Sequence, residues 1–340
     1  MSRQECVALR GIAITSIIMH NYCHWLPDAV MENEFSFINS HYIDFFSNIS
    51  LYNALYQFFS FFGHMGVPVF VMLSAYGLTK KYDNIMSVRP IHFIHSHYMK
   101  LIIPLALGLI AFFSTTHLLY HHINYNILQL IAQLTLTINI APHPENLILP
   151  GPYWYFGMTM QLYVIYIFVI YKRPTRYIFI FTLLIFIVTI FLEHKHYTTL
   201  WIRHNSFGWL FPFLFGVLLG RKQIIIPQKM KAPSVFLTAI VLIFIFESNY
   251  FTWLITPLIV VICAISFVRV LPVFIKNVFY FIGNISLYIY VIHPVFREFT
   301  KGIGQNGYPY IGLSIYIITT LLAAYITKAF VNKINKRIIR

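Results

Sequence analysis

Residues 9–26 read LRGIAITSIIMHNYCHWL, a stretch with the length and apolarity of a membrane-spanning helix. Such a helix needs about 20 apolar residues to cross the hydrocarbon core of a bilayer. Arg10 lies at the start of the stretch, and His20 and His24 lie in its second half. Ionisable side chains are costly inside a bilayer, so these three residues are the first candidates for a functional site.

The composition of the whole chain agrees with a membrane protein. Hydrophobic residues make up 59% of the 340 residues and charged residues only 10%, whereas a soluble domain carries about 25% charged residues. Aromatic residues reach 18%, which suits lipid-facing helices and interfacial belts. This composition excludes disordered proteins, coiled coils and DNA-binding modules. The three cysteines form no CxxC motif, so we expect neither a disulfide framework nor a metal site.

We predict an all-α integral membrane protein with about ten transmembrane helices, organised as a single domain over residues 1–340. No soluble domain and no internal repeat is evident, and we expect the first apolar stretch to stay as a span rather than to be cleaved as a signal peptide. The expected spans are residues 10–27, 58–79, 101–119, 154–171, 177–192, 207–220, 233–248, 250–268, 278–296 and 308–327.

The distribution of charge predicts the orientation of these spans. If the N-terminus is cytoplasmic, every Lys and Arg falls on the inner side except Lys195, Arg203, Arg297 and Lys301. The positive-inside rule therefore places both termini in the cytoplasm. It also explains the net charge of +14 without a nucleic-acid partner. We expect the external cations Lys195 and Arg203 to tolerate replacement.

Residues 127–141, ILQLIAQLTLTINIA, are apolar but do not fit this alternation. A full span here would move every later cytoplasmic loop to the outer side, against the positive-inside rule. We therefore predict a re-entrant or interfacial helix on the outer side, which requires that its backbone ends be buried in protein.

The two histidines of the first span can act together. At 1.5 Å per residue, His20 lies about 15 Å along the helix axis from Arg10, near the middle of the bilayer. His24 follows one turn later and can face the same cavity. The alternative is a pair of histidines that only hydrogen-bond to neighbouring helices.

Three further groups of residues are candidates for binding or catalysis. Residues 80–100 are basic and include Lys80, Lys81, His97 and Lys100; they can bind a polyphosphate donor, although positive-inside bias explains the same residues. The expected ninth span carries Ser286 and His293, which precedes Pro294. The fourth opens with Trp154 and Tyr155, which either anchor the helix at the interface or contact substrate.

Five segments occur in the order LRGIAI (9–14), GVPVFVMLSAYGL (66–78), the basic start of the third span, WYFGMTMQLYVIY (154–166) and ISLYIYVIHPV (285–295). Together they resemble the acyltransferase-3 family of multispanning membrane acyltransferases, which includes the O-acetyltransferases of bacterial surface polysaccharides. The resemblance covers nearly the whole chain.

The resemblance implies transfer of an acyl group, most often acetyl, from cytoplasmic acetyl-CoA to a hydroxyl of a cell-surface glycan or lipid-linked sugar. It implies a multi-pass protein of the bacterial inner membrane that holds no permanently bound cofactor. The essential Arg and His of the family correspond to Arg10 and His20, and its later histidine corresponds to His293. Its arginine pair at the third span corresponds to His97 and Lys100.

Two of these correspondences deviate from the family. Arg10 and His20 are ten positions apart, whereas the family spacing is eleven, so His24 is an alternative to His20. His97 and Lys100 lack the fork with which an arginine pair binds phosphate. A neutral imidazole suits removal of a proton from a sugar hydroxyl, and we expect His20 to be that base.

The remaining candidate residues are expected to bind the two substrates. Arg10, Lys80, Lys81 and Lys100 would hold donor phosphates, while Trp154, Tyr155 and Ser286 would contact substrate. A polytopic transporter or a flippase for a polysaccharide precursor is the alternative function. Proteins of that class often show inverted repeats and broken helices, which the sequence does not indicate.

Overall fold

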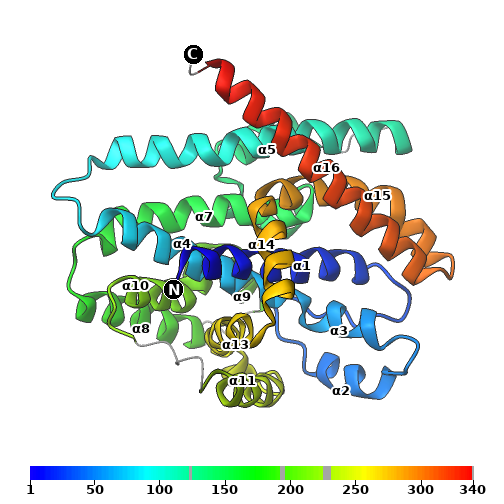
Figure 1. Ribbon diagram of the computed structural model, residues 1–340, viewed down its shortest axis with the longest axis horizontal. Coiled ribbons are helices and arrows are strands. Elements are labelled where there is room, and N and C mark those ends of the chain that lie inside the picture. Colours follow the sequence, from blue (N-terminus) through cyan, green and yellow to red (C-terminus); the bar gives the residue numbers. More distant parts are fainter. Residues whose placement is uncertain (122–124, 192–195, 225–230, 339–340) are drawn as a thin grey trace.

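A computed structural model describes residues 1–121, 125–191, 196–224 and 231–338. Helices account for 80% of the described residues, and no strand occurs among them. The all-helical prediction is therefore confirmed. In Figure 1 the long helices α1, α5 and α7 run roughly parallel, with α1 in the middle, α5 on one side, and α11 and α13 on the other.

The helices are α1 (Arg3–Cys23), α2 (Asn39–Asn48), α3 (Ala54–Phe62), α4 (Gly66–Tyr82), α5 (Pro90–Tyr120), α6 (Ile127–Leu134), α7 (Trp154–Ile165), α8 (Thr175–Phe191), α9 (His196–His204), α10 (Leu210–Gly220), α11 (Ala232–Phe246), α12 (Tyr250–Trp253), α13 (Thr256–Val270), α14 (Val273–Asn284), α15 (Ser286–Gln305) and α16 (Pro309–Ile338). Short 3-10 turns are η1 (Gly63–Met65), η2 (Ile138–Ile140), η3 (Pro144–Asn146), η4 (Gly151–Tyr153) and η6 (Ser206–Trp209), and η5 (Tyr166–Ile170) is a π-helical turn.

Five helical segments among the described residues are long and apolar enough to cross a membrane: Arg3–Cys23, Ala54–Tyr82, Pro90–Tyr120, Gly151–Ile170 and Pro309–Val331. A sixth span results if the bent pair α14 and α15 is counted as one. Four of the expected spans contain shorter apolar helices, which are Thr175–Phe191, Ser206–Gly220, Ala232–Phe246 and Thr256–Val270. The total of ten spans and the cytoplasmic location of the termini therefore stay predictions.

The apolar segment 127–141 does not form a continuous helix. Its helical part, α6, has 8 residues, about 12 Å at 1.5 Å per residue, which is too short to cross the hydrocarbon core. The Asn126 side chain caps its N-terminus. Beyond α6, the Asn139 amide donates to the carbonyls of Trp154 (2.8 Å) and His204 (2.7 Å). The far end of the segment is thus anchored inside the protein, as a re-entrant segment requires.

The expected span over 278–296 is not one continuous helix, because the chain bends by 74° between α14 and α15, and whether the bent pair forms a single span stays a prediction. The interruption lies at Ile285, which is buried, and the Ser286 hydroxyl donates to the Gly283 carbonyl (2.9 Å). Burial in protein is the condition under which a helix can be broken at membrane depth. After the bend, α15 continues past Pro294 to Gln305, so residues expected in an outer loop are helical.

Helix α1 occupies the interior of the molecule. A capping box of Ser2 and Glu5 starts it, and 67% of its apolar window is buried, against 28% for α5 and for α16. It packs against α3, α4, α13, α14 and α15. Glycines make this possible: a Cβ on Gly63 would lie 2.6 Å from the Cβ of His20, and one on Gly66 would overlap the Ala13 carbonyl. Small residues let membrane helices approach each other this closely.

The two glycines of α4 give a matched test of this packing. Gly66→Ala should lower stability by about 1–3 kcal/mol, the usual cost of overpacking, because the new Cβ overlaps the Ala13 carbonyl. Gly77→Ala is the control, since no atom lies within 4 Å of the Cβ position, and it should be neutral or stabilising. Thermal unfolding of both variants in one detergent measures the difference. Equal unfolding temperatures would contradict the close packing of α1 against α4.

Candidate functional site

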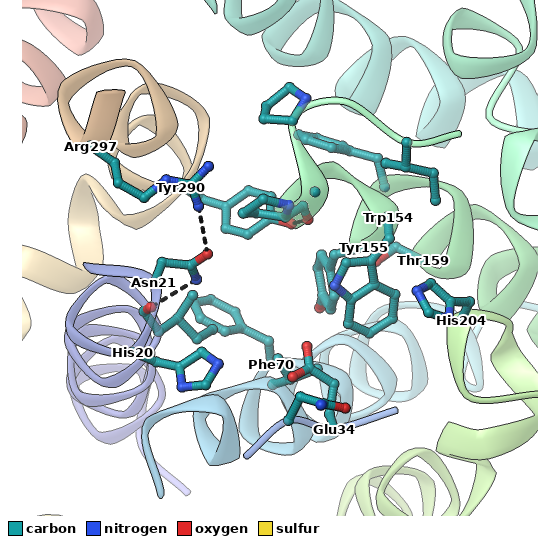
Figure 2. Close-up of a pocket in the computed structure, with 18 of the residues that line it drawn as sticks. His20, Asn21, Glu34, Phe70, Trp154, Tyr155, Thr159, His204, Tyr290 and Arg297 are labelled. Atoms are coloured by element: carbon teal, nitrogen blue, oxygen red, sulfur yellow. Dashed lines mark hydrogen bonds between the residues drawn. The ribbon is translucent and has the colours of Figure 1, made fainter. Parts of the chain in front are cut away.

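One cavity of about 840 Å³ lies among α1, α4, α5, α7 and α15. It is lined by side chains of α1 from Arg10 to Asn21, and by His24 and Trp25, which follow the helix. At 1.5 Å per residue, Arg10 and Asn21 are about 16 Å apart along the helix axis, which is about half the thickness of a hydrocarbon core. Figure 2 shows His20 and Asn21 of α1 facing Tyr155 and Thr159 of α7 across the cavity.

The structure brings seven of the predicted site residues into this cavity. They are Arg10, His20, His24, Lys100, Trp154, Tyr155 and Ser286. They come from four helices and from positions far apart in the sequence, so their convergence could not follow from the first span alone.

The other four predicted site residues lie elsewhere. His293 is fully buried and does not line the cavity. Its Nδ1 contacts the backbone carbonyl of Tyr290 at 2.7 Å. The His97 Nδ1 contacts the Phe93 carbonyl at 2.7 Å, within its own helix. Lys80 lines a second cavity of about 730 Å³ together with Arg221 and Lys222, among others. Lys81 is exposed, with its ammonium 4.9 Å from the ring centre of Tyr82.

The hydrogen bonds of His20 define which of its nitrogens is basic. Its Nδ1 lies 3.2 Å from the Phe59 carbonyl and 3.1 Å from the Ser60 carbonyl. Carbonyl oxygens only accept hydrogen bonds, so Nδ1 carries the proton and the neutral ring keeps its lone pair on Nε2. The rings of His24 and His64 lie close by, with centroids at 4.5 and 5.5 Å. His20 is thus held in the tautomer that a general base needs.

Arg10 and Lys100 give this cavity a cationic end. Both residues line it. Neither side chain makes a hydrogen bond or an ion pair with another described residue. Cations without a protein partner that face one cavity favour an anionic ligand, and phosphate is one of the anions that Arg and Lys bind through charge-assisted hydrogen bonds.

Glu34 and Trp154 lie on the opposite side of the cavity from α15 (Figure 2). Burial raises the pKa of the Glu34 carboxyl to about 7, although the Arg203 charge and a hydrogen bond from Trp154 act in the opposite direction. His204 stacks on Phe35 with ring centroids 3.8 Å apart, and this contact holds the Glu34 loop against α9.

Arg203 is not the tolerant surface cation expected from the sequence. It is 3% exposed, and its Nε donates to the Glu34 carbonyl at 2.7 Å. Its guanidinium lies 4.8 Å from the ring centre of Trp209 and 4.5 Å from that of Trp253. Arg203 thus supports the loop that carries Glu34. Lys195, the other cation expected to tolerate replacement, lies outside the described residues.

Sequence reasoning missed four of the residues that line the cavity, namely Asn21, Glu34, Tyr290 and Arg297. A signal for two of them was present. Ser286, Tyr290, His293 and Arg297 recur at helical spacing along α15, but the expected end of the span at 296 placed Arg297 in a loop. No periodic pattern marks Glu34, which reaches the cavity from a segment without regular structure.

The described residues contain no group of His, Cys, Asp and Glu that could hold a metal ion. The fold and the site define a polytopic helical membrane protein with a cavity in its core that is lined by apolar, aromatic and several charged side chains. The chain matches the acyltransferase-3 family, described as Acyltransferase domain, over residues 8–328, and it belongs to this family. No curated protein and no solved structure matches it significantly. The protein is therefore an integral membrane acyltransferase.

The raised pKa of Glu34 predicts a pH dependence of stability. A carboxyl whose folded pKa lies above its unfolded value of 4.5 stabilises the fold while protonated, and that stability is lost as the pH rises from 4.5 through about 7. The full effect is on the order of 3 kcal/mol. Relative to Glu34→Gln, wild type should therefore unfold at progressively lower temperature between pH 5 and pH 8. If the difference in unfolding temperature between wild type and Glu34→Gln does not change with pH, the pKa of Glu34 is not raised by folding.

Proposed function

We propose that this acyltransferase moves an acetyl group from cytoplasmic acetyl-CoA to a hydroxyl of a cell-surface glycan or lipid-linked sugar. The observation that carries the proposal is the single cavity that contains both a pair of unpaired cations, Arg10 and Lys100, and a histidine with a free Nε2, His20. In this proposal the protein lies in a bacterial inner membrane with Arg10 on the cytoplasmic side.

The two ends of the cavity suit the two substrates. The phosphates of the donor would lie against Arg10 and Lys100, which directs the thioester along α1 towards His20. The acceptor would enter from the other end and pack against Trp154 and Tyr155, whose rings line the cavity there. Lys80 and Lys81 lie outside this cavity, so we assign them at most to attraction of the donor.

The chemistry then needs one base. The His20 Nε2 removes the proton of the acceptor hydroxyl while its oxygen attacks the thioester carbonyl carbon. The tetrahedral intermediate collapses with cleavage of the carbon–sulfur bond. The CoA thiolate leaves and takes the proton from the His20 imidazolium, which regenerates the neutral base. The acetyl group is now esterified to the sugar, and nothing is oxidised or reduced.

His293 and Ser286 take indirect roles in this proposal. The Ser286 hydroxyl donates to the Gly283 carbonyl, so its position at the cavity wall serves the bend between α14 and α15 as well as any substrate contact. His293 contacts the carbonyl of Tyr290, a lining residue, and we assign it a positioning role through that contact.

One observation favours the alternative of a transporter. The bend of 74° between α14 and α15 breaks a span beside the cavity, and broken helices at mid-membrane are frequent in secondary transporters. A transporter, however, has no need of a base, so loss of transfer without loss of binding in His20 variants separates the two functions.

Lys100 offers a test of the donor end. Lys100→Ala should raise the apparent KM for acetyl-CoA about tenfold or more, because one charge-assisted phosphate contact is lost. Lys276→Ala, which removes a charge from α14 outside the cavity, should leave this KM unchanged. Initial rates of labelled acetyl transfer in membranes with matched protein levels give both values. A KM for Lys100→Ala equal to that of wild type would remove Lys100 from the donor site.

His20 and His24 are compared in the test of the base. His20→Ala should lower kcat by about 10²- to 10⁴-fold, the usual contribution of general-base catalysis, while donor KM changes little. His24→Ala should have a weaker effect, because the proposed base is His20, whose tautomer the Phe59 and Ser60 carbonyls fix. Acetyl transfer at saturating donor measures kcat for each. An inactive His24→Ala with a nearly active His20→Ala would transfer the role to His24.

A further inference from the structure

The cavity has a second cationic centre, formed by Arg297 and Lys301 of α15, near the end of α1 away from Arg10. Arg297 contacts Asn21, which follows His20 in α1 (Figure 2). Asn21 and Arg10 are eleven positions apart, about 16 Å along the helix axis. The second centre is therefore separate from the cations proposed to hold the donor phosphates, and it lies on the side from which the acceptor would enter.

Arg297 is buried but poorly satisfied by the protein. Its exposed fraction is 7%. Its two terminal nitrogens donate to Asn21 Oδ1 and to Glu298 Oε1, both at 3.4 Å, whereas charge-assisted bonds are usually about 2.7–2.9 Å long. Its Nε is buried and has no hydrogen-bond partner among the described residues. A buried cation in this condition is costly unless an anion completes its bonds.

The neighbouring carboxylates do not supply that anion. Glu298 is engaged through its other oxygen, which accepts from Lys301 Nζ at 2.5 Å and from the Tyr120 hydroxyl at 3.2 Å. Glu145, which also lines the cavity, pairs with His143 at 3.1 Å. Two cations therefore share the Glu298 carboxylate, and an excess positive charge remains at Arg297.

An aromatic side chain lies beside this charge. The Trp25 ring is 43% exposed and lines the cavity. The Arg297 guanidinium lies 5.3 Å from its centre and the Lys301 ammonium 4.7 Å. A cation next to an accessible indole offers both a charged contact and a flat apolar surface for a sugar ring.

We propose that the acceptor is an acidic sugar, whose carboxylate or phosphate binds Arg297 while its ring packs against Trp25. This inference rests on the proposed function, and it names the acceptor class of the same site. The planar guanidinium fork suits either anion, because both present two oxygens to paired N–H donors. Binding at Arg297 then leaves the remaining hydroxyls of the sugar towards His20, which precedes Asn21 in the chain.

The experiment compares three small sugars on the purified full-length protein in lipid nanodiscs: methyl β-D-glucoside, methyl β-D-glucuronide and glucose 1-phosphate. Binding is measured by titration calorimetry, and acetyl transfer from labelled acetyl-CoA is measured in parallel. Wild type should bind at least one of the two anionic sugars about tenfold or more tightly than the neutral glucoside. Preference for the glucuronide identifies a sugar carboxylate as the recognised anion, and preference for glucose 1-phosphate identifies a phosphate.

Three variants test whether Arg297 causes the preference for anionic sugars. Arg297→Gln should abolish the preference for the anionic sugar, and Arg297→Lys should retain part of it, because the charge is kept and the fork is lost. Arg89→Gln removes an exposed charge outside the cavity and should keep the full preference. Equal binding of all three sugars by wild type would overturn the inference, whether or not the Arg297 variants fold. Preferential binding without any acetyl transfer would overturn the proposed function and leave the anion site intact.

Discussion

The close approach of the backbone of α1 to its neighbours is the constraint on which the site depends. Gly63 and Gly66 let the second membrane segment lie directly against α1. On the other side, Gly11 meets the backbone of α14 at Phe279, and Gly283 meets that of α1 at Val7. Side chains larger than hydrogen at these places would push the helices apart. Because α1 is held this tightly, its polar residues face one cavity instead of lipid.

Cationic side chains line that cavity in two separate places. Arg10 lies in the first half of α1, whereas His20 and Asn21, which contacts Arg297, lie in its last turn; Lys100 and Lys301 also line the cavity. The carbonyls of Phe59 and Ser60 hold His20 in one tautomer, and the Gly63 contact holds its Cβ. The same local packing that fixes α1 therefore also orients the proposed base. Buried Arg203 extends this support to the loop that carries Glu34.

Much of this arrangement could be predicted from the sequence, because membrane spans and buried ionisable residues leave strong local signals. The apolar segments and the cavity positions of Arg10, His20 and Lys100 follow from hydropathy and from the resemblance to the family. The break at Ile285 could not be predicted from hydropathy, because α14 and α15 together are apolar enough to look like one continuous span. Arg297 falls in a predicted loop because the sequence does not distinguish a helix that continues past Pro294 from one that ends there.

The central claim is that one cavity joins a donor on one side of the membrane to an acceptor on the other. Proteoliposomes of uniform orientation, verified by labelling of a cysteine at an exposed terminus, test it directly. Labelled acetyl-CoA is supplied on one side, and methyl β-D-glucoside with methyl β-D-glucuronide on the other, in both arrangements. The account predicts acetylated sugar when the donor is on the Lys100 side and the sugars are opposite. Product formed only when donor and sugars share a compartment would contradict it.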